Sequence, residues 1–384
     1  MKYKNVLEVI NLFGSASNFI GDQFSFLREK GYNMHLICSF DEKLPEFAQK
    51  QGINYKSVVL KRTLSPINDI KAYFEICKYI KQYQIDTIIA HQFKARLIAM
   101  FAAFTMNVPN RIIFAHGVLY ETMHGVKRHI FMIVDRIVAS LSHKVVCVSP
   151  SVANVRVKDR INKPEKNYIL NKGTCGGIDT VNLFNPELYS ITEVDKIKKS
   201  LGLDDDNFII GFCGRLVKDK GIIELIEAFE LLCKAHSQKK IKLLIIGPKE
   251  IRDSIPEETI DKIMNNLNIV FTGYIDHYKI PIYYKLMDIL VLPSYREGFG
   301  MVTIEAAAMQ VPSIVSKSTG CIDSIKENIT GIYTKIDSLD IKKNIELYFD
   351  RNFRNKLAVN CRQFVVDNFD HKKVWPFIID VIEK

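Results

Sequence analysis

The sequence predicts an α/β protein built from two doubly wound, parallel-sheet domains, and three observations support this fold class. The chain has 384 residues, which exceeds one ordinary hydrophobic core and suits two domains of about 180 residues each. Hydrophobic residues make up 47% and charged residues 25% of the chain, as is typical of a soluble globular protein. Short apolar runs also alternate with helical stretches in two successive rounds, which is the pattern of βαβ units.

The first round contains five β-prone runs that read as buried strands. They cover residues 6–12, 34–38, 87–90, 111–115 and 145–148. Helical stretches lie between them at 21–30, 68–83, 95–106 and 127–142. Glu8 and Asn11 interrupt the first apolar run and no small-residue cleavage site follows it, so we predict a buried strand there and not a signal peptide.

The second round repeats the alternation, with predicted strands at 209–213, 242–246, 269–272, 289–292 and 313–316. Between the rounds, residues 187–207 are charged and suggest an interdomain linker. We therefore expect Rossmann-like domains at 1–186 and 187–370, with residues 371–384 crossing back to the first domain.

The segment PSYREGFGMVTIE, residues 293–305, is the most informative for function. It follows a predicted strand, turns at Gly298 and Gly300, and continues into a predicted helix at 302–309 that Pro312 ends. A strand, a glycine turn and a helix N-terminus form an anion site. Because Glu297 precedes the helix and Glu305 lies about one turn inside it, the ligand should be part phosphate and part polyol. A nucleotide sugar has both parts.

EGFGMVTIE resembles the E-x7-E signature of the retaining glycosyltransferases of family 4, which have the GT-B architecture. Three other segments resemble that family in the right order, namely RIIFAHGVLYETMHGVKR (111–128), NKGTCGGIDTVNLFNP (171–186) and GFCGRLVKDKG (211–221). The donor-site motifs lie in two of these four segments, residues 211–221 and residues 297–305. The resemblance implies two Rossmann-like domains that face a central cleft.

The resemblance also implies roles for particular residues. The catalytic candidates are Glu297, His116, Arg215 and Lys220. The donor-binding candidates are Gly14, Arg215, Lys220, Gly298, Phe299, Gly300, Met301, Val302 and Glu305. Glu297 would face the donor sugar without acting as a nucleophile, Glu305 would bind the ribose hydroxyls, and His116 would contact the sugar.

Two of these assignments also have a physical argument. Departure of a diphosphate requires cationic stabilisation, which Arg215 and Lys220 can supply without a metal. Lys220 falls at the start of a predicted helix, where a cation opposes the helix dipole unless an anion is bound.

Gly14 opens the segment Gly-Ser-Ala-Ser after the first strand, where relatives place a glycine loop near the phosphates.

We expect no metal and no cofactor. The aspartates at 204–206 precede a strand instead of following one, so they suggest a turn and not a metal-binding pair. The eight cysteines show neither CxxC nor zinc-type spacing.

Charge is unevenly distributed along the chain. Residues 1–190 contain 25 Lys and Arg against 15 Asp and Glu, while the remainder contains 28 of each. Because no nucleic-acid motif accompanies this surplus, we predict an anionic membrane surface and not nucleic acid as the partner. Phe131 and Met132, beside Lys127 and Arg128, are candidates for insertion, although the core would suit them equally.

We therefore predict a cytoplasmic glycosyltransferase associated peripherally with the inner face of the cell membrane. It would transfer a sugar from a nucleotide sugar, most simply a UDP-sugar, to a lipid-linked saccharide for a surface polysaccharide. Two alternatives stay open at this point, a nucleotide-sugar epimerase of the same fold and a non-catalytic nucleotide-sugar-binding protein.

Overall fold

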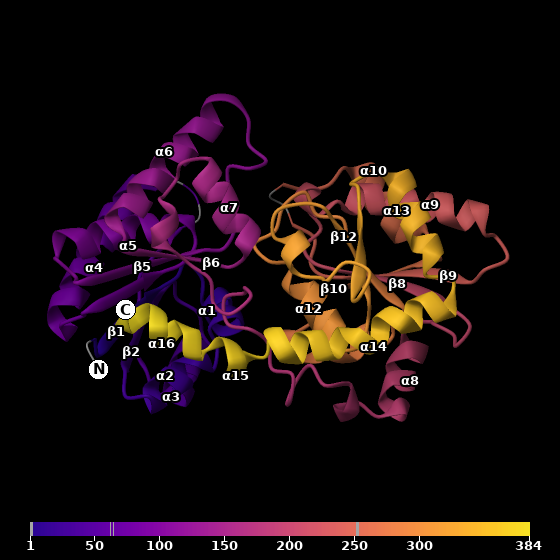
Figure 1. Cartoon of the computed structure of the whole chain (residues 1–384), viewed down its shortest axis with the longest axis horizontal. Helices are drawn as coiled ribbons and strands as arrows, with labels where there is room; N and C mark the ends of the chain where they lie inside the picture. The colour runs from indigo at the N-terminus through magenta and orange to yellow at the C-terminus, as the bar shows by residue number, and fades with distance from the viewer. Residues whose placement is uncertain (1–2, 62, 64, 251–252) are drawn as a thin grey trace. The chain divides into compact units, whose positions relative to one another are not determined.

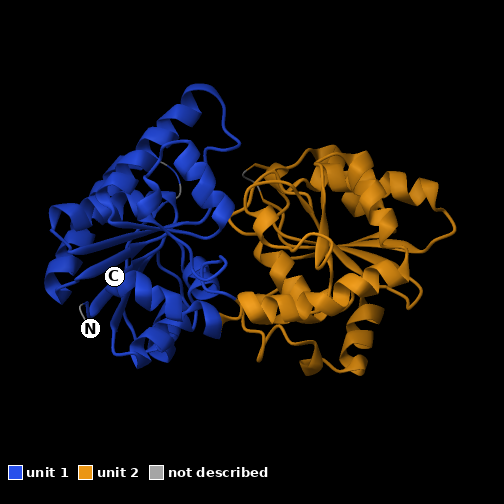
Figure 2. Cartoon of the chain, in the orientation of Figure 1, with its two compact units in different colours: residues 1–177, 372–384 blue, residues 178–371 orange. Residues whose placement is uncertain are grey.

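The computed structural model describes residues 3–61, 63, 65–250 and 253–384, and the chain forms two compact units (Figures 1 and 2). Unit 1 comprises residues 1–177 and 372–384, and unit 2 comprises residues 178–371. The division thus falls after residue 177, and not after residue 186 as we predicted.

The elements of unit 1, in chain order, are β1 (Asn5–Val9), α1 (Phe13–Phe19), α2 (Gln23–Glu29), β2 (Asn33–Cys38), α3 (Leu44–Gln51), β3 (Asn54–Ser57), α4 (Pro66–Tyr83), β4 (Thr87–Ala90), α5 (Phe93–Thr105), β5 (Asn110–Ala115), α6 (Gly125–Leu141), β6 (Lys144–Cys147), α7 (Pro150–Lys158), η1 (Pro164–Lys166), β7 (Asn167–Tyr168) and α16 (Pro376–Glu383).

The elements of unit 2 are η2 (Pro186–Leu188), α8 (Ile191–Ser200), β8 (Phe208–Cys213), η3 (Lys218–Lys220), α9 (Ile222–Ala235), β9 (Ile241–Ile246), α10 (Glu257–Asn265), β10 (Ile269–Gly273), η4 (His277–Lys279), α11 (Ile280–Tyr284), β11 (Ile289–Leu292), α12 (Met301–Ala308), β12 (Ser313–Ser316), η5 (Cys321–Asp323), β13 (Gly331–Thr334), α13 (Ser338–Leu347) and α14 (Arg351–Asn368). A short helix, α15 (His371–Val374), spans the second boundary between the units.

Each unit contains one parallel sheet, which confirms the predicted fold class. The strand orders are β3-β2-β1-β4-β5-β6-β7 in unit 1 and β10-β9-β8-β11-β12-β13 in unit 2. In unit 1 the chain runs outward from β1 in one direction and from β4 in the other. In unit 2 the corresponding pair is β8 and β11. Ligands of open α/β sheets bind outside the carboxyl ends of the strands at such switch points, so the topology alone indicates where each unit would hold a ligand.

All ten predicted strands are present, and the three strands that we missed, β3, β7 and β13, each form an edge of a sheet. Strands β3 and β7 read NYKS and NY and are not fully buried. An edge strand needs no continuous apolar run, because one side of it has no neighbouring strand.

The predicted linker at 187–207 was wrong, because the segment belongs to unit 2 and contains α8. Ser190 caps this helix, since its Oγ accepts a hydrogen bond from the Glu193 N–H and the Glu193 carboxylate accepts one from the Ser190 N–H. The capping box explains why a charged stretch folds as an exposed helix.

Polar contacts hold the C-terminal helix α16 against the sheet of unit 1. Lys144 donates through Nζ to the Val381 carbonyl at 2.6 Å, and Asn110 donates through Nδ2 to the Ile382 carbonyl at 2.9 Å. Tyr32 donates to the Glu383 carboxylate at 2.7 Å. The first two contacts satisfy carbonyls of the last helical turn that have no partner within the helix, and the third binds a side chain of that turn.

Candidate active site

In unit 2, the loops that follow β8 and β11 meet at the carboxyl edge of the sheet. Asp219 joins them, because its backbone carbonyl accepts from the Tyr295 N–H at 2.9 Å and its carboxylate lies 2.7 Å from Arg296 Nη2. Gly221, at a φ of +66°, lies so close to β11's loop that a Cβ there would approach the Pro293 carbonyl oxygen to 2.1 Å. The two loops therefore form one packed structure.

Lys220 and Glu297, which were predicted separately from the two loops, are in direct contact at this edge. The Lys220 ammonium donates to Glu297 Oε1, and Ser294 Oγ donates to the same oxygen at 2.8 Å. The two side chains are only 19% and 14% exposed. The pair thus presents a cation for a phosphate oxygen beside a carboxylate that can accept from a hydroxyl.

Arg215 lies two residues beyond the end of β8, but its side chain is not part of this pair. It is 53% exposed, and its Nη1 is 3.4 Å from Glu250 Oε1. An exposed pair of this kind contributes little stability, so the guanidinium can leave Glu250 for a more strongly charged phosphate.

Glu305 is buried in the first turns of α12, and partners within the protein satisfy its carboxylate. Tyr284 donates from Oη at 2.9 Å, and His277 Nε2 lies 3.1 Å away. Burial opposes protonation of His277, but the hydrogen bond to Glu305 and its negative charge outweigh this and raise the pKa of His277. We had expected ribose to be the partner that this carboxylate requires. No local sequence pattern indicated His277 or Tyr284, and the ribose role of Glu305 stays a prediction.

The glycine turn before α12 offers a ligand its backbone N–H groups more than its side chains. Gly300, at a φ of +78°, is the N-cap of the helix, and the first N–H groups of a helix have no partner within it. The Phe299 ring is buried against Phe369, with ring centroids 5.0 Å apart. Val302 packs on a small apolar cluster beneath the turn. Of the donor-binding candidates 298–302, Phe299 and Val302 could therefore reach a ligand mainly through their main chain.

In unit 1, His116 follows β5 and begins a chain of three polar side chains. His116 Nε2 is 2.8 Å from His91 Nδ1, and His91 Nε2 is 2.6 Å from Glu8 Oε2. Glu8 and His91 are each 1% exposed. Burial lowers the pKa of His116 well below its usual value and that of His91 to about 3, while burial raises the pKa of Glu8. The sequence signal for Glu8 was a lone glutamate within an apolar strand.

Gly14 does not lie in a glycine loop, so that part of its prediction was wrong. It belongs to helix α1, in which the N–H groups of Ser15 and Ala16 donate to the Leu12 carbonyl at 3.1 and 3.2 Å. Ser15 Oγ also accepts from Gln92 Nε2 at 2.9 Å, which ties the helix to the segment after β4. These bonds make a helix where the small residues alone suggested a loop.

The same region of unit 1 holds a cluster of three side chains that could ligate a metal ion. Donor atoms of His91, His116 and Cys175 lie within 4.8 Å of one another. The two histidine nitrogens at 2.8 Å are, however, within hydrogen-bonding distance of each other. Our expectation of no metal stays a prediction.

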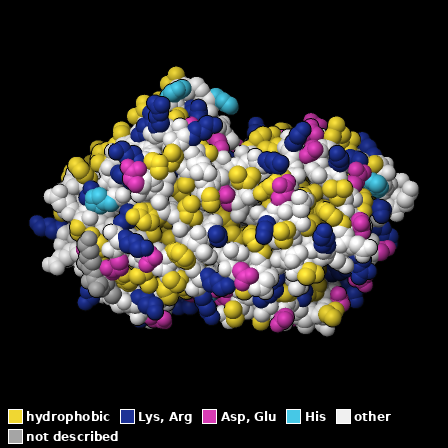
Figure 3. Space-filling model, viewed as in Figure 1, with side chains coloured by type: hydrophobic (Ala, Val, Ile, Leu, Met, Phe, Trp, Pro, Cys, Tyr) yellow, Lys and Arg dark blue, Asp and Glu magenta, His cyan; other side chains and the backbone are white. Residues whose placement is uncertain are grey.

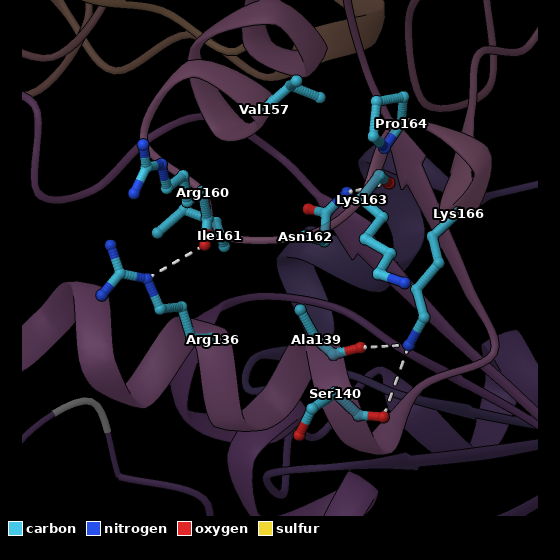
Figure 4. A pocket seen from close by; sticks show the side chains of 10 residues that line it. All are labelled: Arg136, Ala139, Ser140, Val157, Arg160, Ile161, Asn162, Lys163, Pro164 and Lys166. Carbon is cyan, nitrogen blue, oxygen red and sulfur yellow. Dashed lines mark hydrogen bonds between the residues drawn. The ribbon is translucent and has the colours of Figure 1, made fainter.

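A separate pocket of about 430 Å³ lies between α6 and the segment from α7 to η1 (Figure 4). It is not at either switch point, and four cations, Arg136, Arg160, Lys163 and Lys166, line it. Arg136 Nε donates to the Arg160 carbonyl at 3.0 Å, and Lys166 donates to the Ala139 carbonyl at 2.9 Å.

Two family models match the chain, "Glycosyltransferase Family 4" over residues 16–169 and "Glycosyl transferases group 1" over residues 193–364. The capsular polysaccharide biosynthesis glycosyltransferase CapM of Staphylococcus aureus is 30% identical over 98% of this chain and 96% of its own length. The UDP-Gal:alpha-D-GlcNAc-diphosphoundecaprenol alpha-1,3-galactosyltransferase of Escherichia coli is 22% identical over 95% of this chain and 92% of its own.

Two solved structures show the same fold. A glycosyltransferase from Rickettsia africae superposes with a TM-score of 0.82 at 19% identity, covering 100% of this chain and 98% of its own. Anabaena HepE in complex with UDP and glucose superposes with a TM-score of 0.80 at 18% identity, covering 98% and 99%. With its strand–turn–helix motifs in place and a full-length relative at 30% identity, the chain belongs to the family 4 glycosyltransferases and has the GT-B fold.

Proposed function

We propose that this glycosyltransferase transfers a sugar, with retention of configuration, from a UDP-sugar to a lipid-linked saccharide during the synthesis of a bacterial surface polysaccharide. The contact between Lys220 and Glu297 at the switch point of unit 2 carries the proposal. The names of the relatives support its finer part, since the E. coli relative is named for a UDP-linked donor and a diphosphoundecaprenol acceptor. A Campylobacter jejuni relative, 24% identical over 83% of this chain, is also named for a diphospho-undecaprenol-linked acceptor.

In the proposed reaction the protein stabilises the departing diphosphate. Lys220 and Arg215 bind its oxygens, which gain charge as the bond to the anomeric carbon breaks. Glu297 orients Lys220 and accepts from a sugar hydroxyl, Glu305 binds the ribose, and His116 contacts the sugar. The acceptor oxygen attacks from the face that the diphosphate leaves, and a diphosphate oxygen takes the acceptor's proton.

A transfer assay tests this proposal. The purified protein is incubated with a panel of UDP-sugars, with and without undecaprenyl-diphosphate-linked saccharide, and the products are separated. We expect a lipid-linked product that requires both substrates. An epimerase would convert or hydrolyse the UDP-sugar without acceptor, and a non-catalytic binding protein would leave every UDP-sugar unchanged.

We propose that transfer proceeds without a metal, so that activity survives EDTA. Two side-chain cations and the N-terminus of α12 are available to neutralise the diphosphate. Initial rates before and after dialysis against EDTA, together with metal analysis of the purified protein, provide the measurement. A requirement for Mg²⁺ or Mn²⁺ would contradict this account of the leaving group. If the purified parent contains one zinc ion per chain and the Cys175→Ser variant contains none, the cluster of His91, His116 and Cys175 holds a metal.

We propose that unit 1 docks on an anionic membrane through the outer face of α4, α5 and α6. Helix α5 packs against both α4 and α6, so the three helices form one layer on one face of the sheet. Each helix exposes apolar residues, namely Ile67, Ile70, Phe74, Phe101, Phe104, Val126, Ile130, Ile133 and Ile137. None of the helices in the described part of the chain has both the length and the hydropathy of a membrane span.

Helix α6 carries the most informative part of this surface. Val126, Ile130, Ile133 and Ile137 are between 42 and 76% exposed and recur at helical spacing along one side. Lys127 and Arg136 are exposed beside them, and the acidic residue of the helix, Asp135, is buried. Figure 3 shows apolar side chains with Lys and Arg beside them along the flank of unit 1 where α6 lies. An apolar stripe flanked by cations is the arrangement of helices that lie in a membrane interface.

The basic pocket of Figure 4 adjoins this stripe, because Arg136, Ala139 and Ser140 belong to α6. Its cations extend the positive charge beyond the helix. Phe131 and Met132, which were candidates for insertion, pack partly buried against the core of unit 1. The inserting side chains are therefore predicted to be their exposed neighbours.

We expect the full chain to sediment with anionic vesicles, and less of it as salt rises, since charges are screened over about 8 Å at physiological ionic strength. The double variant Ile130→Asp, Ile133→Asp should lose most of this binding. Val359→Asp, which alters an exposed apolar residue of α14 in unit 2, should bind as the parent does. Binding that is unaffected by the α6 variant, or no binding at low salt, would contradict the proposal.

A further inference from the structure

The polar chain in unit 1 ends at a group that can still form a hydrogen bond. His116 is partly exposed, and its Nδ1 has no partner among the described residues. In neutral imidazole one nitrogen donates and the other accepts. The proton on His91 therefore decides which role His116 Nδ1 plays, and Glu8 decides where the proton on His91 lies.

Two arrangements fit the distances. In one, an ionised Glu8 accepts from His91 Nε2–H, His91 Nδ1 accepts from His116 Nε2–H, and His116 Nδ1 is left as an acceptor. In the other, a protonated Glu8 donates to His91 Nε2, His91 Nδ1–H donates to His116 Nε2, and His116 Nδ1–H is left as a donor. The chain has the same length in both arrangements, but the direction of donation is reversed.

The surroundings of Glu8 favour the second arrangement. Its side chain is 1% exposed near the carboxyl end of β1, and a buried carboxylate without a paired cation is costly. The salt-bridge partner within range is the His91 ring itself. Two further titratable groups of the described residues lie near the chain, the buried Cys175 and the buried Arg96. The positive charge of Arg96 disfavours protonation of both histidines. His91 therefore stays neutral and cannot provide the cation.

We propose that Glu8 and His91 are positioning residues: a protonated Glu8 donates to His91, His91 donates to His116, and His116 is thereby fixed as an Nδ1–H donor. An acceptor of hydrogen bonds, such as a hydroxyl oxygen of the sugar, is the ligand group that this donor fits. The inference rests on the proposed function only for the identity of that ligand, because the direction of the hydrogen bonds is a property of the protein without substrate.

The tautomers can be observed without any substrate. Long-range ¹H–¹⁵N correlation spectra of the full chain, labelled with ¹⁵N-histidine, identify which nitrogen of each ring carries the proton. We expect both His91 and His116 to be Nδ1–H tautomers at neutral pH. His91 as an Nε2–H tautomer would overturn the proposal, whether or not the protein transfers sugar.

Two variants of Glu8 provide a second test of the proposal. In Glu8→Gln the amide N–H can replace the acid as donor, so both tautomers should persist and turnover should stay within about twofold of the parent. In Glu8→Leu no group fixes the direction, so the tautomers should mix and kcat should fall about tenfold, the effect of one lost hydrogen bond. An equal loss in both variants would show that the charge of Glu8 is required and would overturn the proposal.

His35 offers a matched control. It is a buried histidine of the same sheet, its Nδ1 lies 3.1 Å from Tyr79 Oη, and its ring packs against Tyr79 and Tyr83. These ring contacts involve none of Glu8, His91 and His116. His35→Asn should leave the tautomers of His91 and His116 and the kcat of the folded protein unchanged. If Glu8→Leu fails to fold, the spectra of the parent and of Glu8→Gln still decide the direction.

Discussion

Lys220→Ala should lower kcat/KM for sugar transfer by an amount equivalent to about 2–4 kcal/mol, the effect of removing one preorganised group from a developing oxyanion. The substitution removes a cation from the leaving diphosphate. It also leaves the largely buried Glu297 carboxylate without its countercharge. Arg215→Ala should cause a loss in the same range, because the guanidinium is free to turn from Glu250 to phosphate.

Lys218→Ala is the matched control, since this exposed lysine lies in the same 3-10 turn as Lys220. It should retain near-normal kinetics. Steady-state kinetics of variants with a normal circular dichroism spectrum provide the comparison. Near-normal turnover in folded Lys220→Ala, or an equal loss in Lys218→Ala, would show that the pair at the switch point does not stabilise the diphosphate.

Gly221→Ala should destabilise unit 2 and disable transfer. The residue has a φ of +66°, and the added Cβ would lie 2.1 Å from the Pro293 carbonyl oxygen. Relief of this clash requires the loop that carries Ser294 and Glu297 to move away from the added Cβ. Backbone strain and overpacking together predict a loss of about 3 kcal/mol in the free energy of unfolding.

Gly202 separates these two effects, because it has the same φ of +66° but nothing within 4 Å of its added Cβ. Gly202→Ala should therefore cost only about 1 kcal/mol, from strain alone, and should leave turnover intact. Thermal unfolding and transfer rates of both variants provide the measurement. Equal effects of the two substitutions would contradict the packing of the β8 and β11 loops described above.

The fold and the donor-side residues could be predicted from the sequence because their signals are local. Buried parallel strands are continuous apolar runs, and Glu297, Gly300 and Glu305 share one strand–turn–helix segment. The edge strands lack such runs. The helix at Gly14 also has a hydrogen bond from Gln92 to Ser15, a contact between distant residues that no local pattern contains.

The partners of the site residues could not be predicted, because the order of the strands creates them. Glu8 meets His91 across 83 positions since β1 and β4 are neighbours. Lys220 meets Glu297 across 77 positions since β8 adjoins β11. The motifs indicated which residues matter, and the topology determined which of them are in contact.

The anomeric configuration of the product tests the central claim most directly. A UDP-sugar with a ¹³C-labelled anomeric carbon is incubated with the protein and a lipid-linked saccharide acceptor, and the product is examined by NMR. We predict a lipid-linked product whose new glycosidic bond keeps the α configuration of the donor. A β-linked product, or the absence of transfer from every UDP-sugar to every lipid-linked acceptor tested, would contradict the proposed retaining transfer.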